Sequence, residues 1–496
     1  MVLGAAGVIA AGVSAGCSSE PRKPETAIDV FDNAWAAVRK AHPDSAYPGP
    51  NSGPQVLPWE TSYILQALQT MVRVTGERRY ADDFVRISRR VLSLRDQELG
   101  HVAFDGQSGP VWSVADRYTV LQATLNDNGG APCLLVSSAA PGVAQPQRLR
   151  VEPNADGHFD LYVFDARNGQ LLDRVKGLST HRGDPAYAPM RLRALSPTSA
   201  WLTCRDMRGS STDSVQLAAA EHTMAPARVS FAVHTGMIAA PLMEFATTVS
   251  QNAKLRSYTS DAEAYRSAAS AAWAHHRAQI KNVDGYTCMV MPRGTPARVD
   301  GTPLPHNQSL AYARLGSGVG RSYGDATISS VSAELFKTVI SDMRPVPGEE
   351  GVIWPYYWSK SSCYSGFSSD SNVSEFTPSM PATKAAEDTQ HGAIDVMALV
   401  AGRANNAGVS DSTIKILANT YGRLVSSGCF AASLSPGAHG CNGSAAGLWA
   451  GSLVPGSSAL DKATRAQLHQ ARKGDPSGVN LLGAALVAAA SPRSVV

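Results

Sequence analysis

Histidine, tyrosine and carboxylate side chains gather in five short polar segments, and these are the residues of the chain that could do acid–base chemistry. The segments are WETSY (59–63), HTGM (234–237), LPHNQ (304–308), VIWPYYW (352–358) and EDTQHGAID (387–395). Each lies beside a stretch of helical periodicity, so side chains from several helix ends could meet. Histidine and tyrosine are common partners in proton transfer, and a carboxylate can orient an imidazole. We therefore expect the site to be built from these segments.

The segment LPHNQ supplies the first catalytic candidates. A proline turn leads directly into His306 and Asn307, and the apolar pattern SLAYARL then predicts a helix. Because His306 lies just outside that predicted helix, we expect it to be catalytic. Asn307 has two interpretations, a catalytic amide or a cap of the helix.

The segment EDTQHGAID supplies a second group. Glu387 and His391 are four residues apart, so on a helix they share a face. Such a pair can orient a catalytic imidazole or bind a metal ion, and Asp388 or Thr389 is a credible N-cap. The chain has no second Cys/His cluster with metal-ligand spacing. We therefore predict no metal and no other cofactor.

The remaining segments contribute binding residues. The aromatic run around Pro355 would suit a sugar-stacking platform, or else a cluster that seals the fold. Its members are Trp354, Tyr356, Tyr357 and Trp358. His234 is either a substrate-binding residue or a capping or core histidine. Glu60 either contacts substrate or lies in the first turn of a helix, where a carboxylate favours the macrodipole.

Composition and the N-terminus bound the class of protein. The chain has 496 residues, 44% hydrophobic, with a net charge of +3, which excludes a mainly disordered chain and gives no basis for nucleic-acid binding. The run MVLGAAGVIAAGVSAGCSS has the length of a signal h-region and resembles a bacterial lipoprotein signal that ends before Cys17. The alternative is an ordinary cleaved secretory signal. Both predict an exported protein, periplasmic or membrane-anchored, that touches a membrane only through a lipid on Cys17.

Six further cysteines permit disulfides in an exported protein. The pair Cys429 and Cys441 is the best candidate, because it would close the loop FAASLSPGAHG. No other pairing follows from the spacing.

Helical hairpins must position the polar segments. Residues 59–92 carry apolar side chains at helical spacing on both sides of the turn TGERRY, which predicts two antiparallel helices. Similar pairs are expected at 237–249 with 262–280, 308–315 with 330–340, 393–404 with 411–425, and 458–472 with 478–490. The pairs have no fixed period, which favours a closed ring over a solenoid. We therefore predict a mainly α fold, an (α/α) toroid of repeated helical hairpins.

One region departs from the helical pattern. Between about residues 113 and 233 the chain consists of short β-type runs, including a hairpin around Asn168-Gly169. The expected organisation is a signal peptide at 1–16, a linker at 17–27, first toroid helices at 28–112, a β-rich insertion at 113–233 and the remaining toroid helices at 234–496. The insertion either covers substrate or is an appended module.

The segments WETSYILQAL, FAVHTGMIAAPL, PHNQSLAYARL, WPYYW and EDTQHGAIDV, in that order, resemble polysaccharide lyase family 38. The resemblance implies cleavage of a uronic-acid polymer, glucuronan or alginate, by β-elimination. It also implies a histidine base and a tyrosine acid. On this sequence these are His306 and Tyr357, with Tyr356 as the alternative acid and Asn307 neutralising the uronate carboxylate.

The same resemblance implies that Glu387, His391 and His234 form the polar floor of a cleft, and that Arg293 or Arg298 holds a neighbouring uronate. The expected partner is an acidic polysaccharide, bound by a monomer. Two other functions stay open. One is a glycoside hydrolase that uses Glu60, Glu387 or Asp388, and the other is a surface lipoprotein that binds glycans without chemistry.

Overall fold

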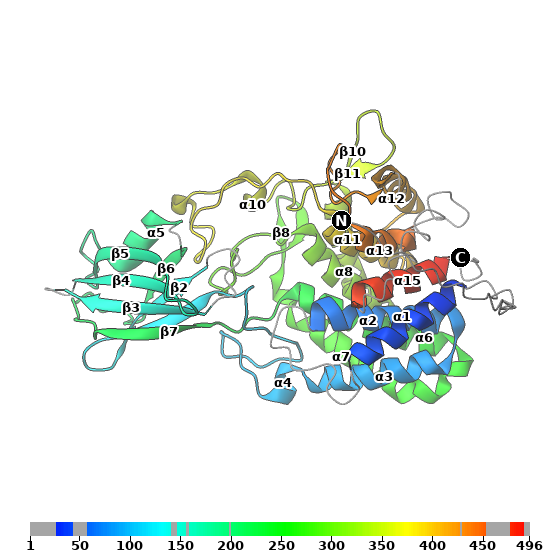
Figure 1. Cartoon of the computed structure of the whole chain (residues 1–496), viewed down its shortest axis with the longest axis horizontal. Helices are drawn as coiled ribbons and strands as arrows, with labels where there is room; N and C mark the ends of the chain where they lie inside the picture. The colour runs from blue at the N-terminus through cyan, green and yellow to red at the C-terminus, as the bar shows by residue number, and fades with distance from the viewer. Residues whose placement is uncertain are drawn as a thin grey trace, which may run out of the picture.

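The computed structural model describes residues 26–42, 57–139, 146–154, 158–197, 200–426, 429–452 and 477–490. It has a helical lobe and a sheet lobe, joined by long connecting segments (Figure 1). The predicted signal peptide, Cys17 and the helix expected at 458–472 lie outside the described residues, as does nearly all of the linker.

The helical lobe contains the helices of four predicted hairpins, those at 59–92, 237–280, 308–340 and 393–425. Its main helices are α1 (Ala27–Ala41), α2 (Ser62–Thr75), α3 (Arg78–Ser93), α6 (Ala232–Gln251), α7 (Thr259–His275), α8 (His306–Tyr323), α9 (Ala326–Ile340), α11 (Thr389–Ala404), α12 (Asp411–Leu424), α13 (Gly443–Leu448) and α15 (Gly478–Ala490). Helices α2 and α3 pack together, as do α6 and α7, and α8 and α9. Helix α2 also packs on α6, α6 on α8, α8 on α11, and α15 on α2. Shorter helices are α4 (Asp96–Leu99), α5 (Ala188–Leu195) and α10 (Ser362–Ser365).

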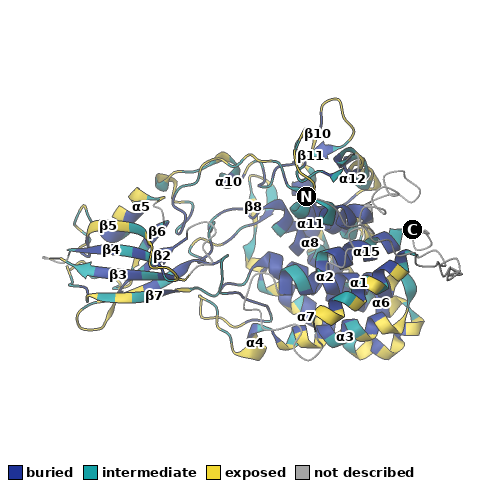
Figure 2. Cartoon of the chain, in the orientation of Figure 1, coloured by how far each residue is buried: buried dark blue, intermediate teal, exposed yellow. Residues whose placement is uncertain are grey.

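Local sequence explains where these helices begin and end. Asp325 caps α9, because its carboxylate accepts hydrogen bonds from the backbone N–H groups of Thr327 and Ile328. Helix α2 ends at Gly76, whose φ of +68° places it in the left-handed region that glycine adopts without strain. Nearly every residue of α2 is buried, whereas α1 and α3 expose their outer faces (Figure 2). Helix α2 therefore belongs to an inner layer of helices, and α1 and α3 belong to an outer layer that covers the inner one.

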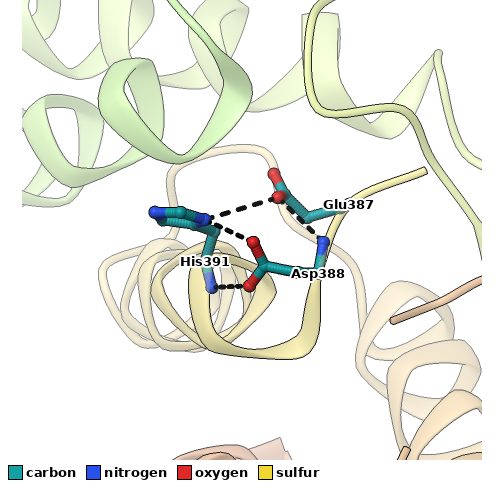
Figure 3. Close-up of side chains that lie close together, drawn as sticks. All are labelled: Glu387, Asp388 and His391. Atoms are coloured by element: carbon teal, nitrogen blue, oxygen red, sulfur yellow. Dashed lines mark hydrogen bonds and ion pairs between the residues drawn. The ribbon is translucent and has the colours of Figure 1, made fainter. Parts of the chain in front are cut away.

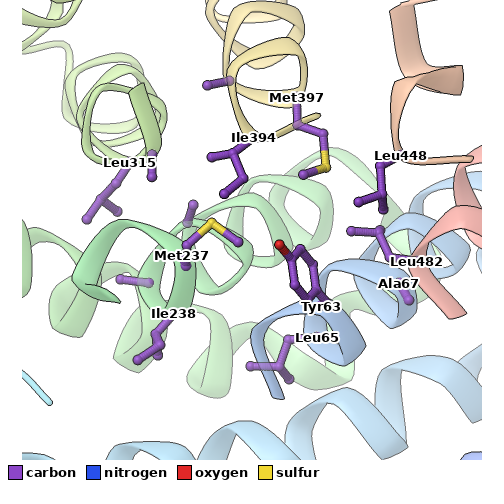
Figure 4. Packing of buried hydrophobic residues seen from close by; sticks show 14 of the residues in the cluster. Tyr63, Leu65, Ala67, Met237, Ile238, Leu315, Ile394, Met397, Leu448 and Leu482 are labelled. Atoms are coloured by element: carbon purple, nitrogen blue, oxygen red, sulfur yellow. The ribbon is translucent and has the colours of Figure 1, made fainter. Parts of the chain in front are cut away.

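The core of the helical lobe joins helices that are distant in sequence. Phe84 of α3 stacks on Phe245 of α6 with ring centroids 4.2 Å apart. Met237 of α6, Ile394 of α11 and Leu482 of α15 belong to the same buried cluster (Figure 4). Burial of each such side chain contributes roughly 1.5–3 kcal/mol relative to exposure.

Among the described residues, seven strands form one antiparallel sheet in the order β5-β4-β3-β7-β1-β2-β6. They are β1 (Leu121–Asn126), β2 (Pro132–Ser138), β3 (Gln147–Pro153), β4 (His158–Asp165), β5 (Leu171–Ser179), β6 (Leu202–Asp206) and β7 (Ala220–Pro226). The predicted hairpin joins β4 and β5, and Gly169 in its turn has a φ of +72°. Two-stranded ladders lie elsewhere at β8 (Ile280–Val283) with β9 (Tyr286–Met289), β10 (Arg344–Pro345) with β11 (Val352–Ile353), and β12 (Val425–Ser426) with β13 (Cys429–Phe430).

The predicted fold class is wrong. About 48% of the chain is helical and 20% is strand, and the large sheet is a curled half-barrel, so a mainly α toroid does not describe the protein. The physical reason is that the sheet has its own core. Leu149, Leu161 and Val163 alternate with outward-facing residues and pack with α5 side chains such as Leu192. The β-type runs thus build a second lobe with an apolar interior.

The predicted pair Cys429 and Cys441 forms a disulfide, with Cα atoms 5.3 Å apart and 12 residues of separation. Replacing both cysteines with alanine should lower the free energy of unfolding by about 3 kcal/mol, because the unfolded chain regains the entropy of an open loop. Urea unfolding of the oxidised wild type, the reduced wild type and the double variant would measure this loss. Equal stability of all three would contradict the prediction.

Candidate functional site

A cavity of about 210 Å³ lies in the helical lobe, beside the connections that lead to and from the sheet lobe, and we call it the tyrosine cavity. Tyr118, just before β1, and Phe231, just after β7, line it and pack with the core of the helical lobe. Its other lining residues are Trp59, Val233, His234, Met291, Ala297, Arg298, Val299, Thr302, Pro303, Leu304, Pro305, Gln308, Tyr356 and Tyr357. Sites of this kind, mostly apolar with a few convergent polar groups, are typical of small-ligand and substrate binding.

Two adjacent tyrosines give this cavity its name. Tyr356 and Tyr357 both line it, and their ring centroids are 4.8 Å apart. Burial raises the pKa of Tyr356 well above its usual value, and the neighbouring Tyr357 and Glu387 raise it further. Burial also raises the pKa of Tyr357. Both phenols are therefore protonated at neutral pH and can donate a proton.

A histidine–carboxylate pair lies against Tyr356. Asp388 is the N-cap of α11, and its Oδ1 accepts hydrogen bonds from the backbone N–H groups of Gln390 and His391. Its Oδ2 accepts a hydrogen bond from Nδ1 of His391 at 2.6 Å (Figure 3). In the neutral imidazole this hydrogen bond places the proton on Nδ1 and the lone pair on Nε2, which points away from both carboxylates in Figure 3. The His391 ring lies 5.5 Å from that of Tyr356, centroid to centroid.

The prediction that Asp388 is an N-cap is thus confirmed. Glu387 precedes this N-cap, so it does not share a helix face with His391 as expected, although the two side chains lie close together. Oε1 of Glu387 lies 4.0 Å from Nδ1 of His391. Glu387 is fully buried, and burial together with Asp395 and Asp388 raises its pKa well above the usual value. A raised pKa favours the protonated, neutral form of Glu387. This limits the negative charge close to His391 and Asp388.

Glu387, Asp388 and His391 could each offer one ligand atom to a metal ion, since the three atoms lie within 4.8 Å of one another. Two of these atoms already have other partners. Nδ1 of His391 is bonded to Asp388, and Oε1 of Glu387 accepts a hydrogen bond from the backbone N–H of Asp388. The arrangement suits an oriented imidazole better than a coordination shell, so we assign no metal.

His234 lines the tyrosine cavity and is almost fully buried. Its ring contacts those of Trp59, Tyr118 and Phe231 at centroid distances of 5.6, 5.8 and 5.2 Å. Burial lowers the pKa of His234 to about 3, so the imidazole is neutral at physiological pH. Its Nδ1 has no hydrogen-bond partner within the described ranges, which leaves it available to a polar ligand group.

Of the two predicted arginines, the structure brings only Arg298 to the tyrosine cavity. Burial lowers the pKa of Arg298 from its usual high value, and the guanidinium stays charged at neutral pH. Arg293 is exposed and donates a hydrogen bond to Oδ1 of Asn372 at 2.8 Å. Arg298 thus places a cationic side chain in the lining of the cavity.

The structure places His306 and Asn307 away from the lining of the tyrosine cavity. His306 is the first residue of α8 rather than a residue outside it, and it is 2% exposed. Its Nε2 lies 2.9 Å from Oδ2 of Asp342, which also accepts a hydrogen bond from the backbone N–H of Ser359. Asn307 is equally buried and does not cap α8, whose N-cap is Pro305. The geometry gives His306 the role of a buried hydrogen-bonding residue.

Other predicted binding residues are also structural. Trp354 is buried and donates its indole N–H to Asp395, and Trp358 is buried against Tyr286. The two tryptophans are buried core residues, whereas Tyr356 and Tyr357, which lie between them in the sequence, line the tyrosine cavity. Glu60 lies in a π-helical turn, Leu57–Thr61, and its Oε1 accepts a hydrogen bond from the backbone N–H of Gly478.

Sequence reasoning missed four residues of importance here. Tyr118, Trp59 and Gln308 line the tyrosine cavity, and Asp342 is the partner of His306. Trp59 and Gln308 stand inside the polar segments WETSY and LPHNQ, so their position was a usable signal. Tyr118 and Asp342 carry no such signal, because only the tertiary fold brings them to their partners.

No family model, no curated protein and no solved structure matches this chain. Within the described part of the chain, no helix is both long enough and apolar enough to cross a membrane.

Proposed function

We propose that this protein is a polysaccharide lyase that cleaves a uronic-acid-containing polysaccharide by β-elimination. The observation that carries the proposal is the contact between His391, oriented by Asp388, and the protonated Tyr356 at the edge of the tyrosine cavity. A base and an acid that lie side by side suit a reaction in which a proton leaves C5 and another reaches O4 of the same sugar ring. The resemblance of the polar segments to polysaccharide lyase family 38 agrees with this chemistry.

Each residue has a definite step. Nε2 of His391 accepts the proton at C5, the electron pair forms the C4–C5 double bond, and the C4–O4 bond breaks. The phenol of Tyr356 donates its proton to the departing O4. Arg298 pairs with the uronate carboxylate and stabilises the negative charge that develops beside it as the C5 proton leaves. His391 then releases its proton to solvent, and solvent restores the proton of Tyr356.

This assignment moves the base from His306 to His391 and prefers Tyr356 over Tyr357 as the acid. Tyr356 contacts His391, whereas Tyr357 contacts Tyr356. We also propose that the protein is exported, and the disulfide between Cys429 and Cys441 supports an oxidising compartment.

Incubation with glucuronan or alginate tests the reaction class. Elimination creates a conjugated unsaturated uronate with strong ultraviolet absorbance, and we expect that absorbance to rise together with new reducing ends. New reducing ends without the absorbance would mean hydrolysis. Binding to the polymer with neither signal would favour a glycan-binding protein, and either of these results would overturn the proposal.

Tyr356→Phe should reduce the initial rate on the polymer by roughly 10²–10⁴-fold, because it removes the proton donor and keeps the ring. Tyr357→Phe is the matched control, since it removes a hydroxyl from the neighbouring position in the same cavity. We expect a smaller loss for the control. If Tyr357→Phe is the more damaging substitution, Tyr357 is the acid.

A further inference from the structure

A second cavity, of about 320 Å³, lies in the helical lobe, and we call it the arginine cavity. It is lined by later turns of the helices whose first turns reach the candidate active site. On α6, His234 lines the tyrosine cavity and Glu244 lines the arginine cavity. These two residues are ten positions apart, or ~15 Å along a helix axis. The arginine cavity is therefore separate from the proposed active site.

The floor of the arginine cavity is polar. Arg314 donates two hydrogen bonds to the carboxylate of Glu244, at 2.7 and 2.9 Å, and a third to Oε1 of Gln66 at 2.5 Å. This last bond fixes the orientation of the Gln66 amide. Gln66 is 2% exposed, and its Nε2 has no acceptor among the residues that the structure describes. A buried N–H group without an acceptor is destabilising, so a ligand oxygen at this point would be favoured.

The mouth of the cavity is cationic. Arg73 follows Gln66 by seven residues on α2, and Arg321 follows Arg314 by seven residues on α8. Seven residues are close to two helical turns, so each arginine lies on the same face as its floor residue and ~10 Å along the axis. Both arginines line the cavity and are exposed. They would attract an anionic group.

The opposite wall is apolar. It comes from α11, α13 and α15, and Figure 4 shows three of its side chains, Met397, Leu448 and Leu482. Val400 and Leu486 extend the same wall. None of the described residues that line the cavity is aromatic, unlike the tyrosine cavity. Without a ring for a sugar to stack on, the wall suits a flexible aliphatic chain.

We propose that the arginine cavity binds a medium-chain aliphatic carboxylate that carries a neutral oxygen at its far end. The carboxylate lies at Arg73 and Arg321, the chain lies along Met397 and Leu482, and the far oxygen accepts the hydrogen bond of Gln66 Nε2. An extended chain of about eight bonds spans ~10 Å, which matches the separation of mouth and floor. A neutral far oxygen also avoids repulsion by Glu244, which a second carboxylate would meet.

Isothermal titration calorimetry with two probes, ω-hydroxyoctanoate and octanoate, tests this proposal on the full chain without any polysaccharide. The wild type should bind ω-hydroxyoctanoate about 3–10-fold more tightly than octanoate, the effect of one hydrogen bond. Gln66→Met should abolish that preference and retain octanoate binding. Arg73→Gln, at an exposed position, should weaken both probes and serves as the variant of choice should Gln66→Met fail to fold.

Several outcomes would overturn the proposal. They are the absence of binding for both probes at millimolar concentration, a hydroxyl preference that survives in Gln66→Met, and unchanged affinity of both probes in Arg73→Gln. Tighter binding of free glucuronate than of octanoate, lost in Arg73→Gln, would make the cavity a sugar site and overturn it as well. Because no lyase substrate is present, these results do not depend on the proposed function.

Discussion

Replacing His391 with glutamine should slow elimination on the order of 10²–10⁴-fold while the protein stays folded. Glutamine can still donate a hydrogen bond to Asp388 but cannot accept the C5 proton. The imidazole is half-exposed, so its removal opens no cavity in the core. The initial rate of unsaturated uronate formation gives the effect, and thermal unfolding shows whether the fold is kept.

Asp388→Asn is the matched variant for the orientation of His391. Asparagine keeps the Oδ1 atom that caps α11, so helix stability should change little. Its amide would donate to Nδ1 of His391, which forces the proton onto Nε2 and removes the lone pair that accepts the C5 proton. We expect a loss of activity comparable to that of His391→Gln. Full activity in both variants would contradict the assignment of His391 as the base. His234→Gln would then be the next variant to measure.

The elements around the site were predictable because they rest on local pattern. The helical hairpins follow from apolar residues at helical spacing, and the turn at Gly76 ends α2 where the sequence TGERRY interrupts that spacing. Asp388 was predictable as a cap for the same reason, because capping depends on residues two or three positions along the chain.

The fold class and the partners of the site residues depend on contacts between distant segments. Short alternating runs predict strands, but not that β3 pairs with both β4 and β7 to build a lobe with its own core. An imidazole such as that of His306 can act as a general base. Its hydrogen bond to Asp342, 36 residues away, instead gives His306 a structural role. The tyrosine cavity depends in the same way on Tyr118, which arrives from the connection to the sheet lobe.

The pairing of His306 with Asp342 leads to the second large effect. Both side chains are at most 4% exposed, so His306→Ala leaves the Asp342 carboxylate buried and hydrogen-bonded to Ser359 without its imidazole partner. Breaking a buried pair in this way costs about 3–5 kcal/mol. Although burial opposes it, the hydrogen bonds from His306 and Ser359 hold the pKa of Asp342 below its usual value. This contribution is therefore present at neutral pH and is lost as the pH falls through that lowered pKa.

Urea unfolding of His306→Ala at neutral pH measures the cost, and the activity of the folded fraction separates stability from catalysis. The double variant His306→Leu/Asp342→Leu is the control, because removing both partners leaves no buried charge and should restore much of the stability. We expect His306→Ala to be destabilised and the double variant to keep lyase activity. An inactive His306→Ala variant with the unfolding free energy of the wild type would instead make His306 catalytic, since a structural hydrogen bond cannot be removed without a loss of stability.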